Sequence, residues 1–498
     1  MNLSSIRQVN LVRAWAVILF ASVLLLGGCT TYSDKFAKLR PQFVDGQYEA
    51  ALTTVEQESG SKDRLLYYLE RGLILHFAGR YTESNVEFSA ADRLADDLYT
   101  KSISEGALSL ISNDNAISYR ARPFEMGMVP YYKALNYLYM GDPQGAQVEA
   151  RRASLLMKKY VDATLDGLRE EDGDEMRRVR NNAFLLYNSG MLYDSDGEIN
   201  DAFTSYRNAA VAFQQNHQIL DLEIPPSLGQ DLQRVAGRMG FWTELEQLKK
   251  DCPQVFAAAD LDSPGGSPKN LKEYDAAVQN KGWLPGYGEV VLYLEAGFVA
   301  HKTQIRFDFP IFESETYSDS DYWSWEIYAG MGNMQALVKG RKVEYWVSVA
   351  APELQDPVGN IGGARISAGV SGSNTVTHQV SSLSRKARIN FDAEKPTIFF
   401  KTIARGLTKY LASREIKKQN DVAGMLANLF GAATESADTR SWLTLPENIH
   451  LGRLSLPAGT YDLKVDVLDR GGRTLTTQII PAVEVKAGGW TFVSRRVF

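Results

Sequence analysis

Gly79-Arg80-Tyr81-Thr82-Glu83-Ser84 is the stretch that decides the fold of the first half of the chain. A similar stretch, Gly46-Gln47-Tyr48-Glu49-Ala50-Ala51, begins 33 residues earlier. In each stretch a glycine stands before residues that can begin a new helix, which is the pattern of a helix–turn–helix hairpin. A period of this length predicts hairpins that stack on one another, because one hairpin cannot bury its apolar face alone.

Small residues recur at fixed offsets around the turns at Gly79, Gly141 and Gly197, and around the first and last of these an aromatic residue recurs as well. The matching positions are Gly72, Ser84, Phe88 and Ala91 around Gly79; Ala134, Ala146, Ala150 and Ala153 around Gly141; and Gly190, Ala202, Tyr206 and Ala209 around Gly197. Small residues let two helices approach closely, and the aromatic residue fills the groove to the next hairpin. The pattern resembles tetratricopeptide repeats and predicts a helical array over residues 29–257, in which Gly190 and Ala202 face each other.

The second half of the chain has the period of β-strands. Residues 258–288 are rich in Pro and Gly and indicate a linker. Alternating segments within 289–498 predict a β-rich, sandwich-like domain that melts separately from the array. The predicted strands include Val290–Glu295, Thr303–Phe309, Tyr322–Tyr328, Val343–Val349 and a meander over 449–497, with a strand pair or mobile loop over 365–381. A helix at about 394–419 is predicted within this domain, capped by Asp392 with Pro396 in its first turn, and a weaker helix covers Val422–Phe430. The fold class is therefore α+β and multidomain.

The N-terminus has the pattern of a secretory signal. Arg7 and Arg13 precede the apolar run Ala14–Leu26, which is too short to span a bilayer as a mature helix. Leu26-Gly27-Gly28-Cys29 resembles the lipobox of bacterial lipoproteins. The resemblance implies removal of residues 1–28, acylation of Cys29 with palmitate as one of the chains, and a stable lipid anchor. Thr30 stands where an aspartate would resemble an inner-membrane retention signal, so the expected place is the outer membrane, facing the periplasm.

Charge and cysteine content exclude several classes of protein. Residues 1–28 hold two arginines and no acid, so the mature chain has 52 basic and 60 acidic side chains and a net charge of −8. Nucleic-acid binding is not expected, because it needs a basic, clustered footprint. Cys252 has no partner once Cys29 is acylated, so no internal disulfide forms, and we expect Cys252 to be a small buried residue.

Motifs for catalysis, metals and cofactors do not emerge from the sequence. The five histidines have no metal-ligand spacing, and the acidic run Asp194–Glu198 does not have its glycine at the position that a calcium loop requires. The glycine-rich stretches near Gly359–Gly363 and Gly369–Gly372 are neither phosphate loops nor nucleophile elbows. We therefore expect no enzyme activity, no catalytic or metal-binding residue and no cofactor.

Two aromatic segments leave alternatives open. Tyr322–Tyr328 could stack on a sugar, or one face of that strand could simply be core. Asp438, Arg440 and Trp442 could form a polar binding cluster. Alternatively, Asp438 and Arg440 pair to fix the entry into the meander, and Trp442 anchors it.

Two segments resemble a poorly characterised family of Gram-negative tetratricopeptide lipoproteins. The first holds Tyr119, Pro123-Phe124-Glu125, Tyr132–Leu138, Gly141-Asp142 and Glu149–Arg152; the second holds Ala437–Trp442, Leu445-Pro446, Ile449 and Arg453. The resemblance implies envelope work near the cell wall. From these segments the candidate partner-binding residues are Tyr119, Glu125, Tyr132, Asn136, Arg151, Arg152, Asp438, Arg440 and Trp442.

Two functions follow as hypotheses. In the first, the chain is a lipid-anchored, non-enzymatic adaptor whose array binds an envelope protein in its groove, while the β-domain binds a second partner or packs on the array. In the second, the β-domain binds peptidoglycan or another glycan, or cleaves it with paired carboxylates.

Overall fold

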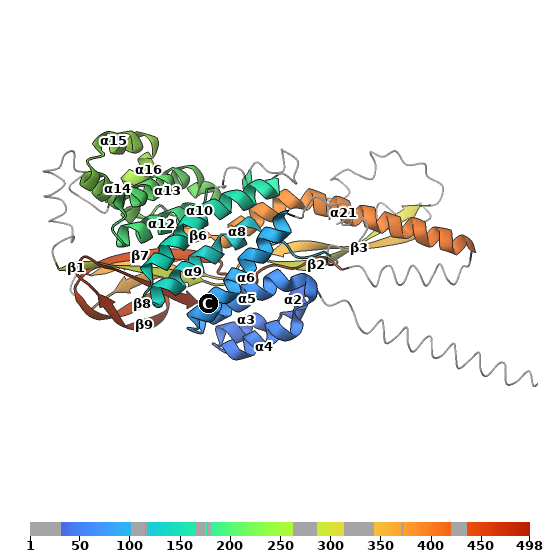
Figure 1. Ribbon diagram of the computed structural model, residues 1–498. Coiled ribbons are helices and arrows are strands. Elements are labelled where there is room, and N and C mark those ends of the chain that lie inside the picture. The colour runs from blue at the N-terminus through green and yellow to red at the C-terminus, as the bar shows by residue number, and fades with distance from the viewer. Residues whose placement is uncertain are drawn as a thin grey trace, which may run out of the picture.

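The computed structural model describes residues 31–100, 115, 117–165, 175, 176, 179, 181–261, 286–312, 343–369, 373–419 and 436–498. A helical first half is followed by a sheet-rich second half with one long inserted helix, which confirms the α+β class. In Figure 1 the helices of the first half lie against the sheets, and the long helix α21 extends away from them beside β2 and β3. Among the described residues, no helix combines the length and apolarity needed to cross a membrane.

Successive helices of the first half pair as hairpins. The pairs are α3 (Leu39–Val44) with α4 (Tyr48–Glu58), α5 (Arg64–Phe77) with α6 (Tyr81–Thr100), α9 (Met128–Tyr139) with α10 (Pro143–Leu165), α12 (Ala183–Ser195) with α13 (Ile199–Leu220), and α14 (Pro226–Met239) with α15 (Trp242–Asp251). Shorter helices are α2 (Tyr32–Lys35), α8 (Pro123–Met126) and α16 (Pro253–Leu261). Four predicted turns are confirmed, and their glycines adopt φ of +68° to +84°, a region that side chains disfavour.

The predicted small residues do bring paired helices together. A Cβ atom added to Gly72 would lie 2.6 Å from the Phe88 ring, and one added to Gly190 would collide with the Tyr206 ring. The partner of Gly190 on the next helix is therefore an aromatic ring, while Ala202 is fully buried nearby in the same core. The offsets thus predicted close packing correctly, but the residue against Gly190 is Tyr206 of the same hairpin, where the sequence had placed Ala202.

The strands in the described residues form two four-stranded sheets and a ribbon. The inner sheet, in the order β10-β1-β7-β6, holds β10 (Trp490–Val497), β1 (Tyr287–Ala296), β7 (Asn448–Pro457) and β6 (His378–Ser382). The outer sheet, in the order β5-β4-β8-β9, holds β5 (Asn374–Val376), β4 (Ile361–Ser367), β8 (Gly459–Asp469) and β9 (Thr474–Val485). The ribbon pairs β2 (His301–Phe312) with β3 (Val343–Gln355). β1 runs parallel to β10 and antiparallel to β7, with Val291 beside Phe492 and Arg453.

Both faces of the inner sheet are buried, and they belong to different cores. Val290, Leu292 and Leu294 of β1 pack against the outer sheet in the sandwich core. Val291 and Tyr293, which point the other way, belong to one continuous cluster with the helices, running from Tyr32 to Phe492. The two halves of the chain therefore share a core, and from this we expect them to unfold together, whereas the sequence predicted separate melting.

Helix α21 begins earlier than the sequence suggests. It spans Leu383–Gln419, so the predicted start near residue 394 and the cap at Asp392 are wrong, and Pro396 lies inside the helix. Ser382 accepts the backbone N–H of Arg385 at 3.3 Å at the true start, directly after β6. Buried side chains on both sides of Pro396 keep the helix in place, although proline removes one backbone bond. The predicted segments Tyr322–Tyr328 and Val422–Phe430, Cys29 with its signal, and most of the linker lie outside the described residues.

Candidate functional site

The first helix of each central hairpin faces the inner sheet, and we call this side of the array the inner face. The Tyr293 hydroxyl of β1 donates to Asn188 Oδ1 of α12 at 2.5 Å, and the Tyr139 hydroxyl of α9 donates to Ser494 Oγ of β10 at 2.9 Å. Figure 1 shows α5, α9 and α12 lying along the sheet. The chain's own sheet therefore packs on the inner face of the array, which is the second of the two roles that the sequence allowed for the β-domain.

Glu295 is the buried carboxylate at the middle of this contact. It accepts hydrogen bonds from the hydroxyls of Tyr131 at 3.1 Å and Tyr132 at 2.8 Å, and Arg496 of β10 lies 3.3 Å away. Burial raises the pKa of Glu295, although Arg496 and both tyrosines favour its charged form. The Arg496 guanidinium also lies 5.3 Å from the Phe298 ring centre and so makes a cation–π contact. One carboxylate thus joins α9 to two strands.

Glu70 of α5 makes the same kind of bridge to the segment before β7. Its carboxylate accepts the backbone N–H of Leu443 at 2.6 Å and the hydroxyl of Thr444. Burial raises the pKa of Glu70 to about 7, and the two hydrogen bonds oppose that shift. Glu70 therefore titrates near neutrality in the folded chain, far above its ordinary range.

Glu125 of α8 organises the predicted cluster around Trp442. It accepts the backbone N–H of Trp442 at 2.7 Å and the hydroxyl of Tyr119 at 2.6 Å. Arg440 donates to Asp438 at 2.8 Å and 2.9 Å, and its guanidinium lies 5.6 Å from the Tyr119 ring centre. Burial opposes ionisation of Asp438, but Arg440 and Lys302 hold its pKa well below the ordinary value. These contacts fit the second of our two alternatives for this segment. In it, Asp438 and Arg440 pair to fix the entry into the strands, and Trp442 anchors that segment.

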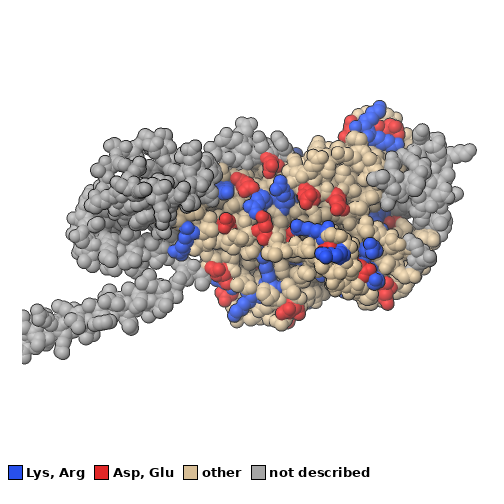
Figure 2. Space-filling model, turned by 180° about the vertical axis from the view of Figure 1, so that it is seen from behind, with Lys and Arg blue, Asp and Glu red and all other residues tan. Residues whose placement is uncertain are grey.

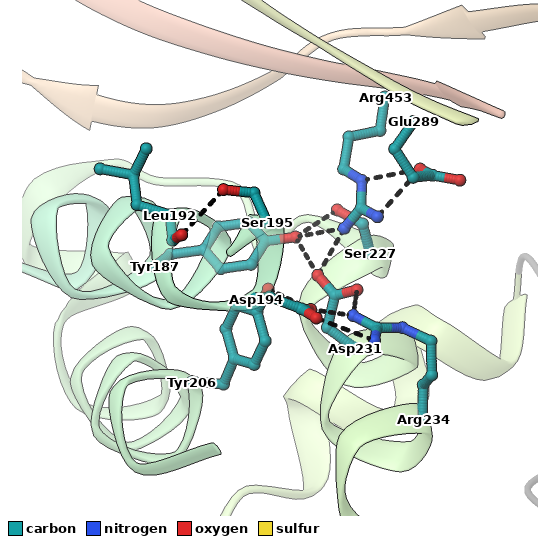
Figure 3. A network of polar contacts seen from close by, with 10 residues as sticks. All are labelled: Tyr187, Leu192, Asp194, Ser195, Tyr206, Ser227, Asp231, Arg234, Glu289 and Arg453. Atoms are coloured by element: carbon teal, nitrogen blue, oxygen red, sulfur yellow. Dashed lines mark hydrogen bonds and ion pairs between the residues drawn. The ribbon is translucent and has the colours of Figure 1, made fainter. Parts of the chain in front are cut away.

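A larger network, drawn in Figure 3, joins α12, α13 and α14 to β1 and β7. Arg453 of β7 pairs with Asp231 of α14 and with Glu289 of β1, the latter at 2.9 Å. Arg234 pairs with Asp231 at 3.0 Å and with Asp194. Burial raises the pKa of Asp231 against the pull of Arg453 and Arg234. Three carboxylates and two guanidiniums are therefore held together in the interior between the helices and the sheet.

Tyrosine hydroxyls complete this network. The Tyr187 hydroxyl donates to Asp231 at 3.0 Å, and the Tyr206 hydroxyl donates to Asp194 at 2.9 Å. Burial disfavours the charged form of Arg453, yet Asp231 and Glu289 raise its pKa above the ordinary value. A buried ion network of this kind costs little only while every member keeps its partners.

Seven of the nine predicted partner-binding residues are used inside the protein. They are Tyr119, Glu125, Tyr132, Asn136, Asp438, Arg440 and Trp442, and all except the half-buried Asp438 are at most 3% exposed. Asn136, for example, donates to Ser84 and Asn85, and its Oδ1 lies 2.6 Å from His76 Nδ1. Their role is to join the helices and strands, because a buried, satisfied side chain cannot also contact a partner. Arg151 differs, since it is exposed on α10, whereas the half-buried Arg152 pairs with Asp92 of α6 at 2.9 Å and with Glu149 at 2.8 Å.

Sequence reasoning missed the acids that bridge the two halves. Glu70 and Glu295 each stand inside an apolar run, Leu65–Leu75 and Val290–Ala296, at positions whose neighbours are buried. Charged residues are almost never fully buried without a partner, so a charge in the buried phase of a helix or strand was an available signal. Their partners lie hundreds of residues away and could not be read from local spacing.

Lys386 and Ser381 form the pair closest to a catalytic arrangement. Lys386 Nζ lies 3.0 Å from Ser381 Oγ, and burial lowers the pKa of Lys386 to about 7. A neutral amine beside a hydroxyl is how some hydrolases activate serine. Here Ser381 is 0% and Lys386 5% exposed, so no substrate reaches either group in this conformation.

Metal and charge searches add little at the surface. No cluster of three or more His, Cys, Asp or Glu side chains with metal-binding geometry occurs in the described part of the chain. The face drawn in Figure 2 shows basic and acidic side chains intermixed across the described elements. That face therefore carries no field of one sign that would attract a phosphate backbone.

Comparisons with known proteins give only a distant likeness. No protein-family model matches the chain, and no curated protein matches it. Among solved structures, the crystal structure of BtubC (BKLC) from P. vanneervenii matches 55% of this chain and 90% of its own, at 15% sequence identity and a TM-score of 0.28. A likeness this weak carries no argument about fold or function.

Proposed function

We propose that the chain is an outer-membrane lipoprotein that faces the periplasm and acts as a non-enzymatic, protein-binding adaptor of the cell envelope. The anchor part of the proposal is supported by the sequence alone, through the basic and apolar run that ends at Cys29. The adaptor part is supported by what the array leaves exposed once its inner face is filled. Cell-wall assembly is the process that the family resemblance suggests.

A stripe of exposed side chains on α10 is the observation that carries the adaptor proposal. Val148 is 52% and Leu155 is 70% exposed, and Arg151 and Lys158 are exposed between and beyond them. These positions are spaced by three, four and three residues, so they share one face of the helix. We call them the α10 stripe. Its counterpart on α6 includes Val86, which is 63% exposed.

The partner that fits the α10 stripe is an amphipathic helix with apolar and acidic residues. Val148 and Leu155 offer two apolar contacts one heptad apart, the spacing at which helices meet. Arg151 and Lys158 follow each apolar residue by one turn and would pair with carboxylates on the partner. The Arg151 guanidinium lies 5.6 Å from the Tyr193 ring centre, which is a cation–π contact.

Site-specific crosslinking in intact cells tests the adaptor role. A photo-crosslinking residue at Leu155 of the full lipoprotein should give a discrete adduct with an envelope protein. The same residue at Thr204, exposed on α13, serves as the control position. Val148→Glu together with Arg151→Glu should abolish the Leu155 adduct while the protein level stays unchanged. A Leu155 position that yields no adduct, or one unaffected by the double change, would remove the stripe as the binding surface.

Palmitate labelling tests the anchor independently. The wild-type chain should incorporate labelled palmitate and fractionate with outer membranes, whereas Cys29→Ser should leave an unlabelled precursor. Absence of label in the wild type would refute the anchor without touching the adaptor claim. The glycan alternative rests on Tyr322–Tyr328, which lie outside the described residues, and no contact in the described residues favours it.

A further inference from the structure

The chain enters its folded body directly after the expected anchor at Cys29. Thr31, Tyr32 and Phe36 are at most 7% exposed, so the first described residues are already buried. The ring centres of Tyr32 and Phe36 lie 4.4 Å apart, and both residues belong to the continuous cluster that joins the helices to the inner sheet. The described part of the chain therefore has no extended tether before its core.

Hydrogen bonds fix this first turn in place. The Thr31 N–H and hydroxyl both donate to Asp34 Oδ2, at 3.0 Å and 2.7 Å, which closes a capping box at the start of α2. The Ser33 N–H donates to Thr439 Oγ1 at 3.1 Å, and Thr439 is fully buried in the segment before β7. The start of α2 is thus tied to a part of the chain 406 residues away in sequence.

The covalent distance from Cys29 to Thr31 decides how far the body can stand from a bilayer. Two residues of extended chain span at most about 7 Å. The polar layer between hydrocarbon and water is about 5–8 Å thick on each side of a bilayer. With acyl chains of Cys29 in the hydrocarbon, Thr31 lies near the outer edge of the headgroups. Because Thr31 is buried in the body, the body must touch the membrane there.

Two exposed lysines follow this point directly. Lys35 comes four residues after Thr31, about one helical turn away, and Lys38 lies between α2 and α3. Asp34 is exposed beside them, and its carboxylate already accepts the two bonds from Thr31. Lysines attract anionic headgroups when they lie within a Debye length of the surface, which is about 8–10 Å.

A third exposed lysine comes from a distant part of the sequence. Lys62 belongs to the short 3₁₀ helix Ser61–Asp63, and its carbonyl accepts a hydrogen bond from Arg440 at 3.5 Å. Arg440 directly follows Thr439, the residue that holds α2. We call Lys35, Lys38 and Lys62 the α2 lysines.

A lipid surface is favoured over a protein as what covers the α2 lysines. The anchor brings headgroups to Thr31 through a covalent link of limited length, whatever else the molecule binds. A protein partner would need its own affinity for this place and would have to fit between the body and the bilayer. The sign of the α2 lysines also agrees with anionic headgroups.

We propose that the end of the molecule around α2 rests on the bilayer, with the α2 lysines against anionic lipid headgroups. The proposal deepens the anchor part of the proposed function and rests on it. One side of the body then always faces the membrane. Figure 1 shows α15 far from α2, so that helix supplies positions for comparison.

Energy transfer from single labelled sites to the membrane tests this contact. The full lipoprotein is reconstituted in vesicles of phosphatidylethanolamine and phosphatidylglycerol that carry an acceptor dye on their headgroups. A donor dye on Lys38→Cys should lose at least twice as much emission as one on Lys250→Cys, which replaces an exposed lysine of α15 and is the matched control. Cys252 is buried, so the introduced thiol is labelled selectively.

Two further variants separate the tether from the charges. About 20 Gly and Ser residues inserted between Thr30 and Thr31 reach about 25 Å on average, so emission at residue 38 should rise toward that at residue 250. Lys35→Glu together with Lys62→Glu should reduce the emission loss at residue 38, because acids repel anionic headgroups. Palmitate labelling should be unchanged in both variants, and circular dichroism checks that both are folded.

Three results would overturn the contact while the anchor stands. With palmitate present, the donors at residues 38 and 250 could lose emission equally, the inserted linker could leave the loss unchanged, or the charge reversal could do so. A loss at residue 38 that appears only after an envelope extract is added would assign the α2 lysines to a protein instead. Absence of palmitate in the wild type would refute the anchor itself and, with it, this contact.

Discussion

The inner and outer faces of the helices differ in how deeply their side chains are buried and in what they contact. On the inner face, Glu70, Tyr132 and Asn188 are buried and bonded to the inner sheet or to the segment before β7. On the outer face of α10, Leu155 and Arg151 are exposed to solvent. A hairpin array usually binds ligands on its inner face, but here the second half of the same chain covers that face. The difference shows that a residue's place in the repeat pattern does not tell whether it is free to bind a partner, because the sheet covers one face of the helices.

The largest loss of stability is expected when a buried arginine between the helices and the sheet is removed. Arg453→Met would leave Asp231 and Glu289 without their shared guanidinium, and breaking a buried pair costs about 3–5 kcal/mol. Urea unfolding monitored by circular dichroism measures the loss. Arg80→Met, which removes a partly exposed arginine paired with Glu49 and Glu83, should change stability far less. Equal losses in the two variants would mean that the inner face is not a closed contact.

The second effect is a dependence on pH that comes from Glu70. Its pKa is about 7 when folded and 4.5 ordinarily, so the folded chain holds a proton over this range that the unfolded chain releases. The stability due to Glu70 is therefore complete below pH 4.5 and falls as pH rises through 7, by up to about 3 kcal/mol.

Glu70→Gln isolates this contribution, because the amide cannot release a proton. As pH rises from 5 to 8, the unfolding free energy of the wild type should fall relative to that of Glu70→Gln. Parallel pH profiles for the two proteins would show that Glu70 titrates as it does in water.

A smaller effect is expected from overpacking the array itself. Ala202→Leu adds three heavy atoms to a fully buried site beside Tyr206, and overpacking costs about 1–3 kcal/mol. Thr204→Leu, on the exposed side of the same helix, is the control and should change stability little. If Ala202→Leu unfolds at the same urea concentration as the wild type, the fourth hairpin does not pack as described.

The smallest effect on stability is expected on the outer face. Val148→Gln and Leu155→Gln should each change the free energy of unfolding by less than about 0.5 kcal/mol, as is usual for exposed positions. Both changes should nevertheless weaken the crosslink proposed for the α10 stripe. A loss above about 1 kcal/mol would show that something covers the stripe in the folded protein.

Local signals in the sequence predicted the elements but not their contacts. Gly79 and Gly197 mark hairpin turns because only glycine readily takes their positive φ. Val290–Glu295 was correctly predicted as a strand, and both faces of it are buried. The start of α21 was predicted too late, because Asp392 and Pro396 are typical of a helix cap and a first turn. Both lie within the helix, which packing against its neighbours stabilises there.

Most of the candidate partner-binding residues are buried and bonded to other parts of the chain, and Arg151 stays a candidate for binding. Glu125 and Trp442 are 317 residues apart in sequence yet share a hydrogen bond. No spacing rule relates such positions, and so a conspicuous polar residue could be read as a surface site when its partner was within the chain. The bridging acid Glu295 was passed over for the same reason, since its partners come from α9 and β10.

Calorimetry of the wild-type protein tests the central claim most directly. Because one continuous core includes both the helices and the inner sheet, the described parts of the chain should unfold together. The account predicts a single heat-absorption peak with equal calorimetric and van't Hoff enthalpies. Two peaks, of which Ala202→Leu lowers only one, would contradict it and would return the array and the sandwich to separate domains.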